Sequence, residues 1–147
     1  MEYELFIYST YKAEYIANRL ILSDESLEYE MKIYEGSSIY IGCELFSMNI
    51  EIEDISDLDF IKESYGVNVN LCIDFQVYNK TYRLGIRKML KVIGAMLSQI
   101  QGDALLLSNG STEVFKKEKE VLYVNNIEEF AKYPFEELGI SYKNIIS

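Results

Sequence analysis

The feature that most constrains this fold is a change in the spacing of apolar residues between Val67 and Ile100. In the first part every second residue is apolar, which is the period of a strand with one buried face; these residues are Val69, Leu71, Ile73, Phe75 and Val77. From Tyr82 onward the spacing becomes three and four, which predicts a helix of about five turns with one apolar side. We therefore expect the helix 82–100 to pack against a sheet that contains the strand 69–77.

The remaining segments alternate between the same two periods. The apolar run 104–107 followed by Asn109-Gly110 predicts a hairpin, because Asn-Gly favours the tight turn that joins two strands. Further short strands are predicted at 114–115 and 121–124, with 116–120 as an exposed turn. Before Val67 the patterns predict a strand at 2–8, a helix at 11–22 capped by Thr10, and a hairpin formed by 27–33 and 39–45. Residues 48–52 form a further strand or a bulged extension, and 54–64 a short helix.

These elements predict an α+β fold: an antiparallel sheet with two main helices packed on one face. A helical turn is expected before Pro134 and an irregular tail from 135. The chain has one proline, no low-complexity stretch and no linker-like segment, so we expect one domain over residues 1–147. It has no signal-peptide pattern and no apolar run long enough for a membrane helix. Cys43 and Cys72 lie within strands, which favours a reduced, cytoplasmic protein without membrane contact.

The charge is concentrated in the first half of the chain. Residues 1–64 contain 15 acidic and 4 basic side chains, whereas residues 65–147 contain 9 acidic and 10 basic ones, giving nets of −11 and +1 that sum to −10. Nucleic acid is an unsuitable partner because phosphate binding requires clustered Lys and Arg. A basic protein surface is the partner that this distribution favours, although a solvated acidic face also explains it.

The sequence lacks the usual catalytic groups. It contains no histidine, which removes the commonest general acid–base group near neutral pH and the commonest transition-metal ligand. No phosphate-binding loop, dinucleotide-binding turn or Cys-x-x-Cys pair is present, so we expect no cofactor and no enzymatic activity. The densest group of carboxylates is a candidate partner-binding segment: Glu51, Glu53, Asp54, Asp57, Asp59 and Glu63. A solvated surface, a protein-binding patch and a carboxylate-based catalytic or metal site are its three interpretations.

Two further patterns have alternative explanations. Arg83, Arg87 and Lys91 form a basic stripe at four-residue spacing on the predicted long helix. The stripe either pairs with carboxylates elsewhere in the chain or contacts an anionic partner. The 13 tyrosines include Tyr34 and Tyr40 on the polar sides of their strands. Tyrosine is favoured both at protein interfaces and at half-buried strand positions, so both roles stay open.

Several segments resemble one protein family. The N-terminal stretch MEYELFIY followed by a helix, the strand YGVNVNLCIDF at 65–75, and the stretch QGDALLLSNG at 101–110 with the later strand VLYVN resemble immunity proteins of bacterial polymorphic toxins of the SitI type. The resemblance extends from Met1 to about Asn125, and its motifs are structural. It implies a protein that binds and neutralises one cognate toxin, and we expect it to occlude a basic surface of that toxin. The alternatives are a small carboxylate-dependent hydrolase and an acidic protein-binding module unrelated to toxins.

Overall fold

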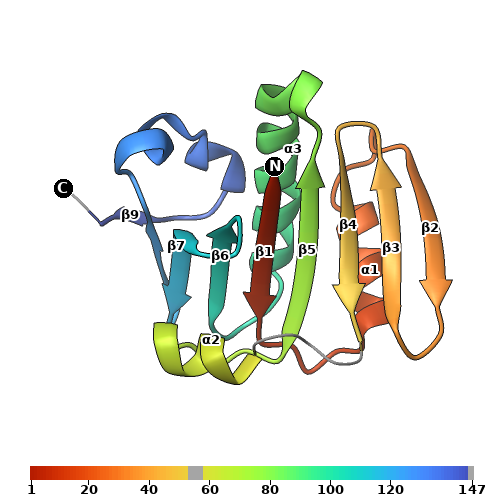
Figure 1. Cartoon of the computed structure of the whole chain (residues 1–147), viewed down its shortest axis with the longest axis horizontal. Coiled ribbons are helices and arrows are strands. Elements are labelled where there is room, and N and C mark those ends of the chain that lie inside the picture. The colour runs from red at the N-terminus through yellow and green to blue at the C-terminus, as the bar shows by residue number, and fades with distance from the viewer. Residues whose placement is uncertain (53–57, 146–147) are drawn as a thin grey trace.

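The computed structural model describes residues 1–52 and 58–145. The central element of this part of the chain is a nine-stranded sheet (Figure 1). The strands are β1 (Glu2–Ile7), β2 (Tyr29–Tyr34), β3 (Ser38–Cys43), β4 (Phe46–Glu51), β5 (Leu71–Val77), β6 (Ala104–Ser108), β7 (Thr112–Glu118), β8 (Val121–Val124) and β9 (Lys143–Asn144). The helices are α1 (Ala13–Leu22), α2 (Leu58–Tyr65) and α3 (Tyr82–Leu97), with short 3-10 segments η1 (Asn79–Thr81), η2 (Glu128–Lys132) and η3 (Phe135–Leu138). The predicted α+β class is confirmed.

The order of strands across the sheet is β2-β3-β4-β5-β1-β6-β7-β8-β9. Every neighbouring pair is antiparallel except β8 and β9, which are parallel. The N-terminal strand β1 therefore lies in the interior of the sheet between β5 and β6, where its register places Tyr3 beside Phe75 and Leu5 beside Ile73. This long-range pairing joins the β2–β5 half of the sheet to the β6–β9 half.

The two main helices, α1 and α3, cover one face of the sheet, as predicted (Figure 1). The apolar side of α3 is fully buried at Met89, Leu90 and Ile93. The alternate residues Leu5 of β1 and Phe75 of β5 point into the same core. The strand β5 and the helix α3 thus bury their apolar faces against each other. The helix predicted over residues 82–100 ends earlier, at Leu97.

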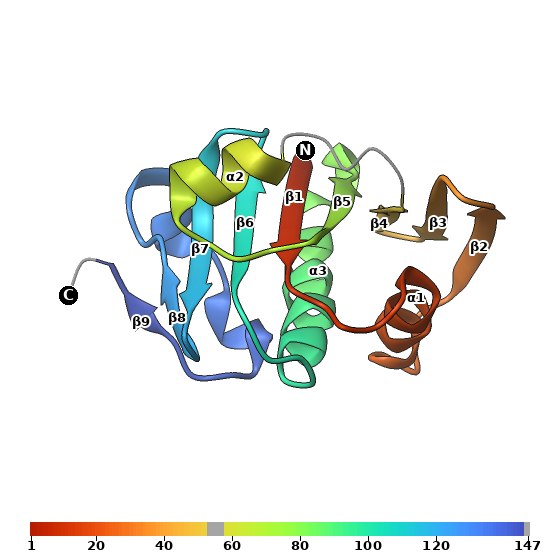
Figure 2. The same ribbon diagram turned by 90° about the horizontal axis from the view of Figure 1, so that it is seen from below.

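The third helix, α2, lies on the opposite face of the sheet (Figure 2). Its buried residue Ile61 packs in a second, smaller core with Phe6, Leu105 and Leu107. Those three residues point away from α3, because adjacent side chains along a strand alternate between faces. The β6 strand is consequently buried on both faces over all of its five residues, which explains the continuous apolar run at its first four positions, 104–107.

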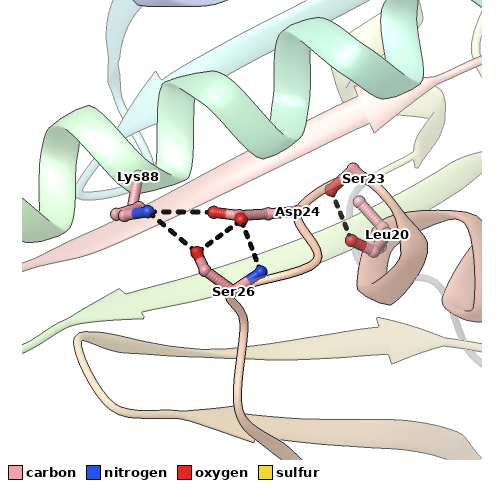
Figure 3. Close-up of polar contacts among 5 residues, drawn as sticks. All are labelled: Leu20, Ser23, Asp24, Ser26 and Lys88. Carbon is pink, nitrogen blue, oxygen red and sulfur yellow. Dashed lines mark hydrogen bonds and ion pairs between the residues drawn. The ribbon is translucent and has the colours of Figure 1, made fainter.

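A partly buried ion pair fixes the loop after α1 against α3 (Figure 3). Lys88 Nζ donates to Asp24 Oδ2 at 3.0 Å, and the Ser26 hydroxyl donates to Asp24 Oδ1 at 2.6 Å. The Ser26 hydrogen bonds and Lys88 hold the pKa of the Asp24 carboxyl well below its usual range. At the end of α1 the Ser23 hydroxyl donates to the Leu20 carbonyl, which caps that helix. These contacts position the start of β2 at the edge of the sheet.

Three local predictions differ from the structure, and one open alternative is decided by it. Thr10 is not the cap of the first helix, which begins at Ala13 with Lys12 at the N-cap and no side-chain cap. The predicted turn 116–120 is shorter, since β7 continues to Glu118 and Lys117 is buried with its Nζ donating to the Gly102 carbonyl at 2.7 Å. For the segment 48–52 the structure selects the first of the two alternatives, a further strand, which spans Phe46–Glu51. Beyond Pro134 the tail contains η3 and β9 instead of being wholly irregular.

Candidate functional site

The face of the sheet opposite α1 and α3 carries a group of carboxylates on neighbouring strands. Glu4 of β1 lies beside Asp74 of β5, and Asp74 lies beside Asn49 of β4. Glu51, at the end of β4, lies beside Cys72 of β5, the residue two before Asp74. We define the carboxylate face as Glu2, Glu4, Glu51 and Asp74. It results from strand alternation, because the intervening residues Tyr3, Leu5, Ile50, Ile73 and Phe75 all point into the main core.

A shallow hollow of about 470 Å³ occupies this face between β4, β5 and β1. The polar side chains Ser47, Asn49 and Gln76 line it together with three of the acids, Glu2, Glu4 and Asp74. Gly110, in the β6–β7 turn, borders the hollow, and a Cβ at that position would lie 3.2 Å from Glu4 Oε1. The hollow is therefore polar, acidic and bounded on one side by a tight turn.

The carboxylate of Asp74 is electrostatically disfavoured. Partial burial, followed by the negative charges of Glu51 and Glu4, raises the pKa of Asp74 from 3.8 to about 6. The Cys72 thiol donates to Asp74 Oδ1 at 3.7 Å and offsets part of this effect. Like charges held close together destabilise one another, so this arrangement costs the folded chain stability near neutral pH.

Glu4, Cys72 and Asp74 are close enough to be considered as metal ligands, since one donor atom from each lies within 4.8 Å of the others. A metal would require the thiolate form of cysteine. Cys72 is fully buried, and burial together with the nearby charge of Asp74 raises its thiol pKa far above the ordinary value. The chemistry of these donors therefore fits a soft metal poorly.

The structure distributes the predicted partner-binding residues over two elements. Glu51 is half-buried at the end of β4 and belongs to the carboxylate face. Asp59 and Glu63 are exposed on α2, on the same side of the sheet. The other three acids, Glu53, Asp54 and Asp57, lie outside the described residues.

Glu2, Glu4 and Asp74 are not among the candidates predicted from sequence, because they are distant in sequence from the acidic segment. Their alternation with buried residues places each on the polar side of its strand, and this signal is visible in the sequence. That β1 pairs with β5, which brings the three acids together, is visible only in the fold.

The helix α2 adds an exposed aromatic ring to the acidic side of the sheet. Phe60 is 62% exposed although the neighbouring Ile61 is buried. Asp59 and Glu63 flank it on the helix. An exposed aromatic ring surrounded by polar groups is a typical anchor of protein–protein interfaces, so α2 has the character of a binding element.

The basic stripe on α3 is partly explained by pairing within the chain. Arg87 contacts Glu137 at 3.2 Å, and both side chains lie at the surface between α3 and η3.

The hydroxyls of Tyr3 and Tyr82 are both hydrogen-bonded to that of Tyr133, so these tyrosines have an internal role. Tyr34, by contrast, is 53% exposed.

The fold and this surface define an α+β protein with an acidic sheet face. None of its described helices is both long and apolar enough to cross a membrane. Comparison with family models gives the more specific assignment: the SitI3-like model matches residues 1–132, and the chain belongs to the SitI3-like family. The family name indicates proteins of the immunity type. Searches among curated proteins and among solved structures found no match.

Proposed function

We propose that this chain is an immunity protein that binds a cognate toxin and neutralises it by covering a basic surface of that toxin. Membership of the SitI3-like family is the observation that carries the proposal. The concentration of acidic groups on one side of the sheet supports it, since complementary charge accelerates encounter and selects the partner. The whole chain 1–147 would act as one unit in the cytoplasm, without a cofactor and without binding nucleic acid or membrane.

The raised pKa of Asp74 on the carboxylate face supports a cationic partner. Burial and the charges of Glu51 and Glu4 raise the pKa of Asp74 to about 6, which means that ionised Asp74 is disfavoured in the free protein. Lys or Arg side chains of a bound toxin would reverse that effect, because an opposite charge within about 4–6 Å favours the ionised form. Polar groups that destabilise a free protein are common where binding needs them.

The partner-binding segment extends this surface along the chain. Glu51 lies on the carboxylate face, and Asp59 and Glu63 lie on α2, which follows it in sequence. The residues between them include Glu53, Asp54 and Asp57, which we propose as further contacts. A toxin that covers the hollow and α2 together would contact all of these acids.

Charge reversal tests the proposal. The variant Asp59→Lys/Glu63→Lys should slow association with the toxin by about 10-fold or more and reduce protection of cells that express it. Glu14→Lys/Glu25→Lys is the matched control, because both residues are exposed and Glu14 lies on α1, across the sheet. The toxin used in this test would be the product of a neighbouring gene that co-purifies with the wild-type chain. Equal association rates for the two variants would move the interface away from α2.

The exposed ring on α2 gives a second test with a different physical basis. Phe60→Ala should weaken toxin binding by about 2 kcal/mol, the size expected of an aromatic anchor. Because Phe60 is 62% exposed, the free energy of unfolding should change little. Leu84→Ala, which truncates a 56% exposed residue on α3, is the control. Unchanged affinity in Phe60→Ala would show that α2 contributes charge alone.

One observation favours the alternative of a carboxylate-dependent hydrolase. Glu4 and Asp74 have donor atoms within 4.8 Å, and the pKa of Asp74 is raised to about 6, which suits a general acid. Against it, the hollow is half open to solvent and polar or acidic side chains line much of it, whereas small-molecule sites bury most of their ligand among apolar groups. A hydrolytic activity of the purified chain that Asp74→Asn abolishes would establish the enzyme and overturn the immunity proposal.

A further inference from the structure

The strand β2 forms one edge of the sheet and pairs only with β3 among the described residues. Its six residues leave a row of backbone N–H and C=O groups on the outer side, and such a row is a template for pairing with another strand. The opposite edge is formed by β9, which has two residues. β2 is therefore the long edge of the sheet.

The side chains of β2 are apolar on one face and polar on the other. Tyr29, Met31 and Ile33 lie beside Cys43, Ile41 and Ile39 of β3, and the last two belong to the main core. Yet Tyr29 is 50% and Ile33 55% exposed. The helix α1 packs against β3 and β4, and on this side of β2 only Met31 is partly buried against the main core. The apolar face of the sheet thus extends one strand beyond the helix that covers it.

We propose that β2 pairs in an antiparallel manner with β2 of a second copy of this chain, with Met31 opposite Met31 at the two-fold axis. In this register Glu30 of each copy lies opposite Lys32 of the other, and Tyr29 lies opposite Ile33. Within one chain Glu30 and Lys32 already contact each other at 3.6 Å, so both lie on the same face, away from α1. The dimer therefore gains two cross-strand ion pairs on one face and a continuous apolar row on the other.

Charge and backbone geometry select this register over its neighbours. If each of the two β2 strands shifts by one residue, Glu30 lies opposite Glu30 for one direction of the shift, and Lys32 lies opposite Lys32 for the other. Like charges directly opposite each other are destabilising. In the intermediate registers the outward N–H and C=O groups of one strand would face inward groups of the other, because these groups alternate along an edge strand. The two-fold symmetry of a closed dimer requires the antiparallel arrangement.

The interface is small, so the dimer is weak. A six-residue strand is about 20 Å long, and the contact falls below the roughly 1,600 Å² that a standard stable complex buries. We expect a dissociation constant of about 1–100 µM. This inference does not rest on the immunity function, and the carboxylate face and α2 both lie away from β2, so a dimer leaves them accessible (Figure 1).

Charge variants test the dimer by sedimentation velocity over concentrations that span the expected dissociation constant. Glu30→Lys and Lys32→Glu each create two like-charge pairs across the axis and should raise the dissociation constant about 10-fold or more. The double variant Glu30→Lys/Lys32→Glu restores complementary pairs and should dimerise like the wild type. Both side chains are more than half exposed, so the variants should fold normally. An equimolar mixture of the two single variants should form a heterodimer.

Disulfide trapping tests the register independently. In a Cys43→Ser background, Met31→Cys should form a disulfide-linked dimer under mild oxidation, because directly opposite residues have Cα atoms at a distance that a disulfide spans. Ile33→Cys is the control, since its opposite residue is Tyr29 and its own copy lies several residues away along the ladder. Equal trapping of both variants would show random collision and would contradict the register.

Two results overturn the proposal. One is a wild-type chain that stays monomeric throughout the concentration range. The other is a dimer whose affinity is unchanged by the single variants Glu30→Lys and Lys32→Glu. If the chain stays monomeric and Lys32→Glu instead weakens toxin binding, the edge serves a strand of the toxin and the second copy is excluded. Since the α2 variants report on the toxin interface separately, failure of the dimer and failure of the immunity function are distinguishable.

Discussion

The two faces of the central strands β1 and β5 differ in almost every physical property. On the side of α1 and α3, Tyr3, Leu5 and Ile73 are fully buried in one large core. On the other side the same strands present Glu2, Glu4 and Asp74 beside a small core under α2. The comparison teaches that one face of these strands supplies the stability, which allows the other face to hold charges that destabilise the fold.

The largest expected effect comes from the helix-covered face. Ile93→Ala should lower the free energy of unfolding by about 4 kcal/mol, because it opens a cavity in the main core where Ile93 is fully buried. Arg83→Ala, on the exposed side of the same helix, should change it by less than about 0.5 kcal/mol. Denaturant unfolding measures both. The opposite order of effects would mean that the helix faces the other way.

The next effect concerns the support that α3 gives to the C-terminal segment. A Cβ on Gly94 would lie 1.8 Å from the Leu138 carbonyl oxygen, so the helix and η3 are in contact only because this residue has no side chain. Gly94→Ala should therefore cost about 3 kcal/mol, since a backbone atom must move. Lys91→Ala, exposed on the same helix, is the control for helix propensity. A neutral or stabilising Gly94→Ala in denaturant unfolding would show that η3 is not held against α3.

Gly94 also shows where prediction from sequence ends. The periods of Val69–Val77 and of the helix from Tyr82 predicted the elements and their buried sides, because a face of apolar residues has few ways to be covered. The prediction that two main helices lie on one face is confirmed for the same reason. A glycine within a helix does not indicate which distant carbonyl approaches it, and nothing near Gly94 in sequence points to Leu138.

For the candidate site, too, local patterns predicted which face a residue occupies but not which distant residues it meets. The polar side of each strand was predictable, and Glu51 was predicted as part of the acidic partner-binding segment. Its meeting with Asp74 and Glu4 depends on strand pairings between residues 1–7, 46–51 and 71–77, which join distant parts of the chain. Local patterns contain no information about partners so far apart, so the carboxylate face emerges from the topology.

A smaller effect is expected in the core under α2. Ile61→Ala should cost about 2 kcal/mol, at the low end of the range for buried isoleucine, because this core is small and lies near the surface. The exposed neighbour Ser64, changed to Ala, is the control. Hydrogen exchange should show α2 opening more often than α3 in the wild type. A loss as large as that of Ile93→Ala would make the two faces equal contributors to stability.

The smallest effect has the opposite sign and comes from the carboxylate face. Asp74→Asn should raise the free energy of unfolding by about 1 kcal/mol at pH 8, allowing for screening by solvent. The pKa of Asp74 is raised from 3.8 to about 6 in the folded chain, mainly by burial and then by Glu51 and Glu4. The folded state therefore binds a proton more tightly than the unfolded state. The favourable contribution of protonated Asp74 is complete below about pH 4 and is lost as the pH rises through 6.

Denaturant unfolding at a series of pH values checks this sign. The advantage of Asp74→Asn over the wild type should be present at pH 8, diminish through pH 6 and vanish near pH 4, because the neutral amide resembles the protonated acid. Asp59→Asn, which removes an exposed acid on α2, is the control for the loss of one negative charge. If Asp74→Asn is destabilising at pH 8, the charge of Asp74 is needed by the fold itself. Asp74 would then stabilise the fold, and the carboxylate face would not be a destabilised surface that the helix-covered face compensates for. The difference between the two faces would give no support to a binding role.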